Sequence, residues 1–150
     1  VVWVDVFVRH LIPFHVTTQE FFEELRKHVN AEGVVAVNLA SSDAPANVRR
    51  AQAVLTTMQL AFPDVIMYGV PGPEWLNTKK GSVNLIYFGG KPVQAMRDPH
   101  FLDVMAHQMN RNQFPPEGFA FFISHDPLIL APGDILTDDF SPLDLLQGEG

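Results

Sequence analysis

The sequence contains no cysteine. This absence excludes a disulfide scaffold, a cysteine nucleophile and any metal site built from thiolates. A chain without cysteine suits a reducing compartment, or one whose redox state does not matter. We therefore expect a cytoplasmic location.

Long apolar runs are also absent. Each hydrophobic stretch is interrupted by Asp, Arg, Gly or Pro well short of the roughly 20 residues that a membrane span requires. We expect neither a transmembrane helix nor a signal peptide in this sequence.

Basic residues are few, because the chain has 10 Lys and Arg against 17 Asp and Glu, for a net charge of -7. Phosphate binding depends on clustered Lys and Arg, and the ten here are scattered, so we expect no nucleic-acid partner. An acidic chain could favour cationic substrates such as polyamines. Acidity can equally serve solubility alone.

The size and composition fit one core. The chain has 150 residues, of which 47% are hydrophobic and only 18% charged, so we expect a single domain over residues 1–150. The sequence begins with Val1 in what resembles the middle of a strand. We therefore expect the domain to be partial, with an upstream part missing.

The first 30 residues predict a strand followed by a helix. Residues 1–8 are apolar except for Asp5, which is typical of a strand covered on both faces. Thr17 and Glu20 form a possible capping box for a helix that ends near Asn30. In an open α/β sheet, ligands gather outside the carboxyl ends of the strands, so Asp5 is a candidate for chemistry.

A second strand is expected at residues 34–39, with residues 40–43 as the loop beyond its carboxyl end. A strand, a helix and a strand with a short return predict a parallel, right-handed crossover. The next helix is expected to start at Pro45 and to stop at Pro63.

Two further strands are predicted at residues 64–70 and 82–88. A turn-rich loop without a helix joins them, so we expect antiparallel neighbours. A helix should follow at about residues 98–110. The proline-rich tail, residues 113–150, reads as irregular chain that wraps the core, with at most a short strand at residues 119–124.

Two motifs lie at opposite ends of the chain. The first is Asp5-x-Phe7, followed by Ile12-Pro13-x-His15-x-x-Thr18-x-Glu20-Phe21-Phe22 and by Gly33-Val34-Val35-Ala36-Val37-Asn38. The second is Leu136-Thr137-Asp138-Asp139-Phe140-Ser141-Pro142-Leu143-Asp144. In this order they resemble the spermidine synthase-like (aminopropyltransferase-like) family, especially its members fused to membrane transporters.

The resemblance implies an α/β fold like that of class I S-adenosylmethionine-dependent methyltransferases, a Rossmann-like sheet with strand order 3-2-1-4-5-7-6 and an antiparallel seventh strand. This chain would supply the carboxyl-terminal half, strands four to seven. The glycine-rich turn that holds the nucleoside in the family has no counterpart, since no Gly-x-Gly-x-x-Gly occurs. We therefore expect no tightly bound cofactor. Decarboxylated S-adenosylmethionine or S-adenosylmethionine would be a co-substrate only if the upstream half is present.

The family's reaction transfers an aminopropyl group from decarboxylated S-adenosylmethionine to an amine. By the resemblance, Asp5 is the acid that holds the cationic substrate and accepts its proton. The alternative is a structural carboxylate that caps a helix or pairs with Arg9. The family has a second acid, and the positions where it would be expected hold Val8 and His10 in this chain. His10 could act as a base near neutral pH, or be a solvated loop histidine.

Four further residues are candidates for substrate binding, each with a structural alternative. Asn38 and Asp43 lie on or just past the second strand, where a strand-end hydrogen bond and a helix cap are the alternatives. Asp138 and Asp139 match the closing motif and could add negative charge at the substrate entrance, or form a turn. We expect no metal site, because the His and Asp stripe within residues 98–110 is the polar face of a predicted helix.

Three functions compete. The first is a spermidine synthase-like transferase, expected to be inactive as this fragment alone. The second is a catalytically degenerate, non-enzymatic module for assembly or regulation, and the third a small-molecule methyltransferase. If upstream strands are absent, residues 1–8 form an exposed apolar edge. We therefore expect a homo-oligomer, or pairing with the missing half.

Overall fold

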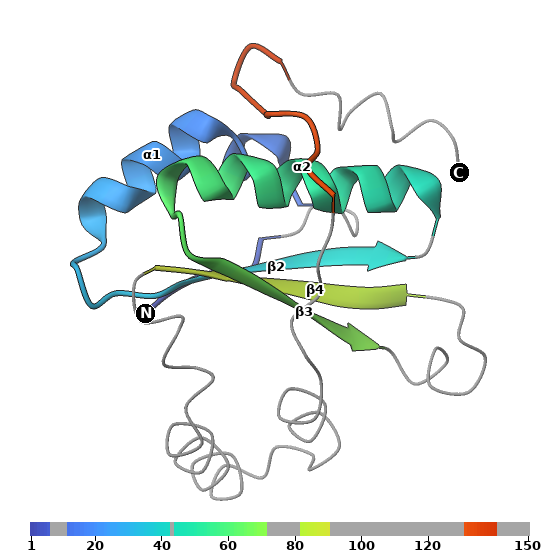
Figure 1. The fold of residues 1–150 in the computed structure, drawn as a ribbon, viewed down its shortest axis with the longest axis horizontal. Helices are drawn as coiled ribbons and strands as arrows, with labels where there is room; N and C mark the ends of the chain where they lie inside the picture. The colour runs from blue at the N-terminus through green and yellow to red at the C-terminus, as the bar shows by residue number, and fades with distance from the viewer. Residues whose placement is uncertain (7–11, 43, 72–81, 91–130, 141–150) are drawn as a thin grey trace, which may run out of the picture.

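The computed structural model describes residues 1–6, 12–42, 44–71, 82–90 and 131–140. These residues form a mixed α/β fold with a four-stranded sheet, as the sequence predicted (Figure 1). The predicted helix at residues 98–110 and strand at residues 119–124 lie outside the described residues. The elements in chain order are β1 (Val2–Val4), the short 3-10 helix η1 (Phe14–Val16), α1 (Gln19–His28), β2 (Val35–Ser42), α2 (Pro45–Ala61), β3 (Val65–Pro71) and β4 (Ser82–Gly89).

The sheet has the order β1-β2-β4-β3. β1 pairs in parallel with β2, and β4 runs antiparallel to both β2 and β3. Three strands therefore share one direction, and the last strand in sequence is inserted between two of them. The predicted parallel pairing of the first two strands and antiparallel pairing of the last two are both confirmed.

The boundaries of two strands differ from the sequence prediction. Residues 40–42 were expected in a loop, but β2 continues to Ser42 because β4 pairs with it along its whole length, as far as Ser42 opposite Ser82. β1 ends at Val4 and is not covered on both faces, since Trp3 is 52% exposed. The described neighbour of β1 is β2, so the apolar sequence there does not imply burial.

The start of α1 corrects the predicted capping box. The N-cap is Thr18, whose hydroxyl accepts a hydrogen bond from the backbone N–H of Phe21 at 3.3 Å. The Thr17 hydroxyl instead donates to the carbonyl of Phe14 in η1, at 2.7 Å. Both threonines are fully buried, so they fix the turn from η1 into α1.

The second helix follows the prediction closely. Pro45 occupies its first turn, where the missing N–H costs nothing, and the helix ends at Ala61, just before Phe62 and Pro63. Residues at the helical period, from Ala51 to Met58, are buried against the sheet. The apolar period therefore identified the correct inner face.

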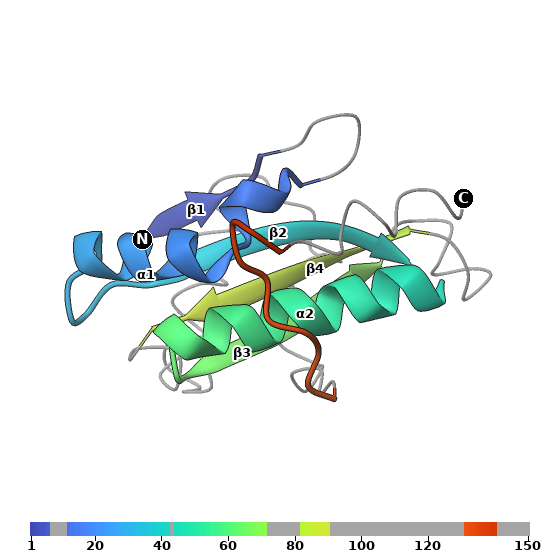
Figure 2. The same cartoon turned by 90° about the horizontal axis from the view of Figure 1, so that it is seen from above.

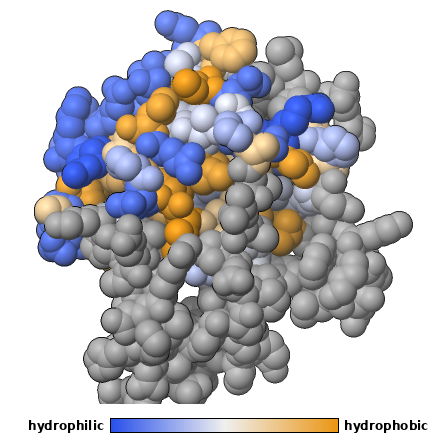
Figure 3. Space-filling view, viewed as in Figure 1, coloured by the Kyte–Doolittle hydropathy of each residue, from blue (hydrophilic) through white to orange (hydrophobic). Residues whose placement is uncertain are grey.

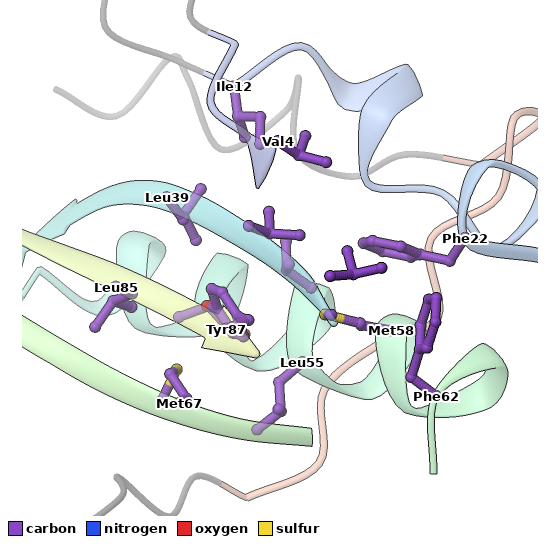
Figure 4. Close-up of a cluster of buried hydrophobic side chains, with 14 of the residues drawn as sticks. Val4, Ile12, Phe22, Leu39, Leu55, Met58, Phe62, Met67, Leu85 and Tyr87 are labelled. Carbon is purple, nitrogen blue, oxygen red and sulfur yellow. The ribbon is translucent and has the colours of Figure 1, made fainter. Parts of the chain in front are cut away.

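Both helices lie on one face of the sheet (Figures 1 and 2). Their apolar faces meet alternate residues of the strands in one core, in which Phe22, Met58 and Phe62 gather beside Tyr87 (Figure 4). The outer surface of α1 is hydrophilic (Figure 3). Candidate functional side chains are therefore to be sought outside this core, at the strand ends and on the opposite face of the sheet.

Tyr87 ties the sheet to α2. Its side chain is fully buried, and its hydroxyl donates to the carbonyl of Ala51 at 3.1 Å. Burial raises the pKa of the Tyr87 hydroxyl far above its usual range, because the charged form would lose its hydration. The hydroxyl therefore stays protonated and holds α2 at a fixed position above β4.

Candidate functional site

Asp5 follows directly after β1 and meets Asn38 of β2. The parallel register places Val4 opposite Val37, so the next residues, Asp5 and Asn38, lie side by side. The Asn38 side-chain N–H donates to one carboxylate oxygen of Asp5 at 3.0 Å. This bond joins residues 33 positions apart and fixes the acid at the sheet edge.

The pair lies on the sheet face opposite the two helices. Val37 and Leu39 belong to the helix-facing core, and Asn38 between them points to the other face because strand side chains alternate. On that face Asn38 stands opposite Ile86, which in turn stands opposite Tyr68. Ile86 and Tyr68 are both buried, so the polar pair is flanked by an apolar sheet surface.

The hydrogen-bonding capacity of the pair is only partly used within the described residues. Asp5 is exposed, and its second carboxylate oxygen has no described partner. The Asn38 side-chain oxygen is buried and accepts no hydrogen bond. Burying an acceptor without a donor costs free energy, so a group that donates an N–H or O–H to the Asn38 oxygen would be favourable at this site.

Two predicted site residues, His10 and Asp43, lie outside the described residues, as does Arg9. The structural alternative of an Asp5–Arg9 pair therefore stays a prediction. His15 of the first motif is exposed in η1, where its ring packs edge-on against Phe14 with centroids 5.7 Å apart.

Asp138 and Asp139 occupy a tight turn between Thr137 and Phe140, which pair with each other through backbone hydrogen bonds. Both aspartates are exposed. Their segment lies on the helical side of the molecule (Figure 1). Among the described residues, no hydrogen bond or ion pair joins either of them to Asp5 or Asn38, so the structure does not bring the two sets of acids together.

Residues 131–140, which we call the strap, cross α2 and reach the start of α1 (Figure 2). The Leu136 carbonyl accepts from the N–H of Gln19 at 2.7 Å, and the Asp138 N–H donates to the Glu20 carboxylate at 3.0 Å. The two sequence motifs therefore meet at the amino end of α1. Glu20 serves the strap there, instead of the capping box that the sequence predicted.

Two threonines of α2 hold the strap, and the sequence analysis missed both. Thr57 is fully buried; its hydroxyl donates to the Ala53 carbonyl at 2.8 Å and accepts from the N–H of Leu136 at 2.9 Å. The Thr56 hydroxyl accepts from the N–H of Gly133 at 2.8 Å. Adjacent threonines beside the apolar positions of the helix were the available signal, since such hydroxyls need partners when buried.

Gly133 permits the close approach. A methyl group at this position would lie 2.5 Å from the backbone nitrogen of Ala53, so a larger residue would push the strap away from α2.

A pocket of about 110 Å³ lies at the other end of the sheet. It is lined by the turn before β2, the end of α2 and the start of β3, including Arg26, Gly33, Phe62 and Asp64. The Arg26 guanidinium donates to the Val29 carbonyl at 3.0 Å, which anchors the end of α1 beside it. Neither Asp5 nor Asn38 borders this pocket.

No family model matches the chain, and no curated protein sequence matches it. Among solved structures it is similar to the crystal structure of a probable spermidine synthase from Corynebacterium glutamicum ATCC 13032. The match has 24% sequence identity and a TM-score of 0.48, and covers 59% of this chain and 29% of that chain. The matched part of this chain thus spans less than a third of the chain in that structure. No helix among the described residues is both long enough and apolar enough to cross a membrane.

The strap gives a first prediction. Thr57→Val keeps the size and burial of the side chain but leaves the Leu136 N–H without an acceptor, so we expect a loss of about 1–3 kcal/mol in the free energy of unfolding. Thr57→Ser, which keeps the hydroxyl, should lose less. The measurement is urea unfolding, together with hydrogen exchange of the Leu136 amide. Unchanged exchange at Leu136 in Thr57→Val would contradict the role of Thr57.

Proposed function

We propose that this chain is the carboxyl-terminal half of a spermidine synthase-like transferase domain, and that Asp5 is its amine-binding acid. The observation that carries the proposal is the Asp5–Asn38 pair, an exposed carboxylate held at the carboxyl end of a parallel strand. Ligands of open α/β sheets gather at that edge. The motif around Asp5 resembles the family motif that contains the catalytic acid.

The strand order supports the assignment to the carboxyl-terminal half. The family resemblance implies strands four, five, seven and six side by side, with the seventh antiparallel. The observed order β1-β2-β4-β3, with β4 antiparallel, is the same arrangement. The meeting of the first and closing motifs at α1 is a second supporting observation, because residues far apart in sequence share one structural unit.

In the proposed reaction a neutral amine nitrogen attacks the carbon next to the sulfonium of decarboxylated S-adenosylmethionine. The new C–N bond forms as the C–S bond breaks, and the sulfur leaves with the bonding electron pair as a thioether. Asp5 first accepts a hydrogen bond from the amine and then takes the proton that the nitrogen must lose. Asn38 orients the carboxylate by occupying one oxygen, which leaves the other for the amine.

This chain supplies only the acceptor side of that reaction. Its sequence has no glycine-rich turn for the nucleoside, so the donor site must come from another segment or chain, and we expect residues 1–150 alone to be inactive. The degenerate, non-enzymatic module is the second candidate. Val8 and His10 favour it, because they replace the family's second acid.

We propose that the edge of β1 contacts the segment or chain that supplies the donor site. Val2 donates its N–H to the Val34 carbonyl, so the backbone groups of Trp3 point away from β2, to the side where no described strand pairs with β1. Val1 is 94% exposed and Trp3 is 52% exposed. An apolar edge of this kind invites pairing with another strand, from the upstream half or from a second copy of the chain.

The proposal for Asp5 predicts that Asp5→Asn, in a protein that includes the donor-binding half, lowers aminopropyl transfer by about 10²- to 10⁴-fold, the usual contribution of a general base. Thermal unfolding should be nearly unchanged, because Asp5 is exposed. Asp139→Asn is the matched control, since it removes an exposed acid of the strap turn. Equal turnover of Asp5→Asn and the parent protein would remove Asp5 from the mechanism.

The proposal for the edge predicts an oligomer for residues 1–150 in light scattering. Trp3→Pro removes the outward N–H together with the indole ring and should give a monomer, whereas Trp3→Val removes the ring but keeps the N–H and should stay associated. A monodisperse monomer before any substitution would refute strand pairing at β1.

A further inference from the structure

Arg50 of α2 carries a buried charge that has no counter-charge among the described residues. Arg50 is only 6% exposed, and its guanidinium donates a hydrogen bond to the side-chain oxygen of Asn47 at 3.1 Å. No carboxylate in the described part of the chain lies within ion-pair distance of it. Burial lowers the pKa of the Arg50 guanidinium, which reflects the cost of keeping this charge out of water.

The amino end of α2 adds positive character at the same place. Its N-cap, Ala44, has no side chain that can accept a hydrogen bond, and the first turn contains no acidic residue. The N–H groups of Ala46 and Asn47 have no acceptor among the described residues. A helix amino end carries a partial positive charge, so an arginine that no described carboxylate neutralises is electrostatically unfavourable beside it.

A short chain of hydrogen bonds directs the guanidinium to that end. The Asn47 side-chain N–H donates to the Ser42 hydroxyl at 2.7 Å, while its oxygen accepts from Arg50. Because Asn47 lies three residues before Arg50, the arginine side chain points back toward the start of the helix. Ser42 is the last residue of β2, so the three side chains meet at the carboxyl end of that strand.

We propose that this end of α2 binds an oxyanion, a carboxylate or phosphate group, between the Arg50 guanidinium and the N–H groups of Ala46 and Asn47, for which the described residues offer no acceptor. The planar guanidinium matches either anion with paired hydrogen bonds. Helix amino ends bind the same groups. The bound anion supplies the negative charge that the described residues lack.

The site is separate from the proposed amine site. Ser42 lies four residues beyond Asn38 along β2, or about 13 Å at roughly 3.3 Å per residue. The oxyanion site therefore does not rest on the proposed transfer reaction, and it can be tested on this chain alone.

The test is a two-dimensional amide NMR titration of the 150-residue chain with inorganic phosphate and, separately, with acetate. We expect saturable shifts of the Ala46 and Asn47 amides and of the Arg50 side-chain N–H, with sodium chloride at matched ionic strength giving none. Arg50→Met should abolish the saturation. Arg49→Met is the matched control, because Arg49 is the exposed neighbour on the same helix and its loss should leave binding intact.

A thermal melt provides a second readout, since a ligand that binds only the folded state raises its stability. Phosphate should raise the melting temperature of the parent chain and of Arg49→Met, and not that of Arg50→Met. The proposal is overturned if the parent amides do not respond to either anion. It is also overturned if they respond only in Asp43→Asn, because Asp43 would then be the counter-charge of Arg50.

Discussion

The parallel pairing of β1 with β2 determines where the candidate acid lies. Only three residues of β1 take part, and they set Val4 opposite Val37. The next step along both chains brings Asp5 to Asn38, on the face away from the helices. A shift of the register by one residue would turn the side chains of β1 to the other face, and the pair would not form.

The strap makes the helical layer depend on residues from the far end of the sequence. Thr57 holds Leu136, and the Leu136 carbonyl satisfies an N–H at the start of α1 that the helix itself cannot satisfy. The first motif and the closing motif therefore act as one structural unit. This unit holds the first turn of α1, at Gln19 and Glu20.

The sequence predicted the periodic features and the two strand pairings well, and the strand ends and side-chain contacts poorly. The apolar period found the inner face of α2, and Pro45 marked its start, because both signals are local. The extension of β2 to Ser42 could not be predicted, since it depends on pairing with β4, some 40 residues later by sequence number. Thr18 was missed as the cap because Thr17, three residues before Glu20, has the spacing of a capping box.

The candidate site shows the same division. A single acid in an apolar strand made Asp5 visible. Asn38 was expected near the end of a strand, but β2 continues to Ser42, so Asn38 lies within the strand. The hydrogen bond between Asp5 and Asn38 requires the register, which no local pattern gives. The expected place of Asp138 and Asp139 near the substrate stays a prediction. The Asp138 N–H donates to Glu20 and the Leu136 carbonyl accepts from Gln19, contacts that the sequence does not reveal.

The central claim is that the Asp5–Asn38 pair binds an amine, and the most direct measurement follows the Asn38 side-chain amide by NMR while a primary diamine such as putrescine is added to the chain. The account predicts a saturable shift of the Asn38 side-chain N–H signals that disappears in Asp5→Asn and persists in Asp139→Asn. A response no larger than that to sodium chloride at matched ionic strength would contradict it.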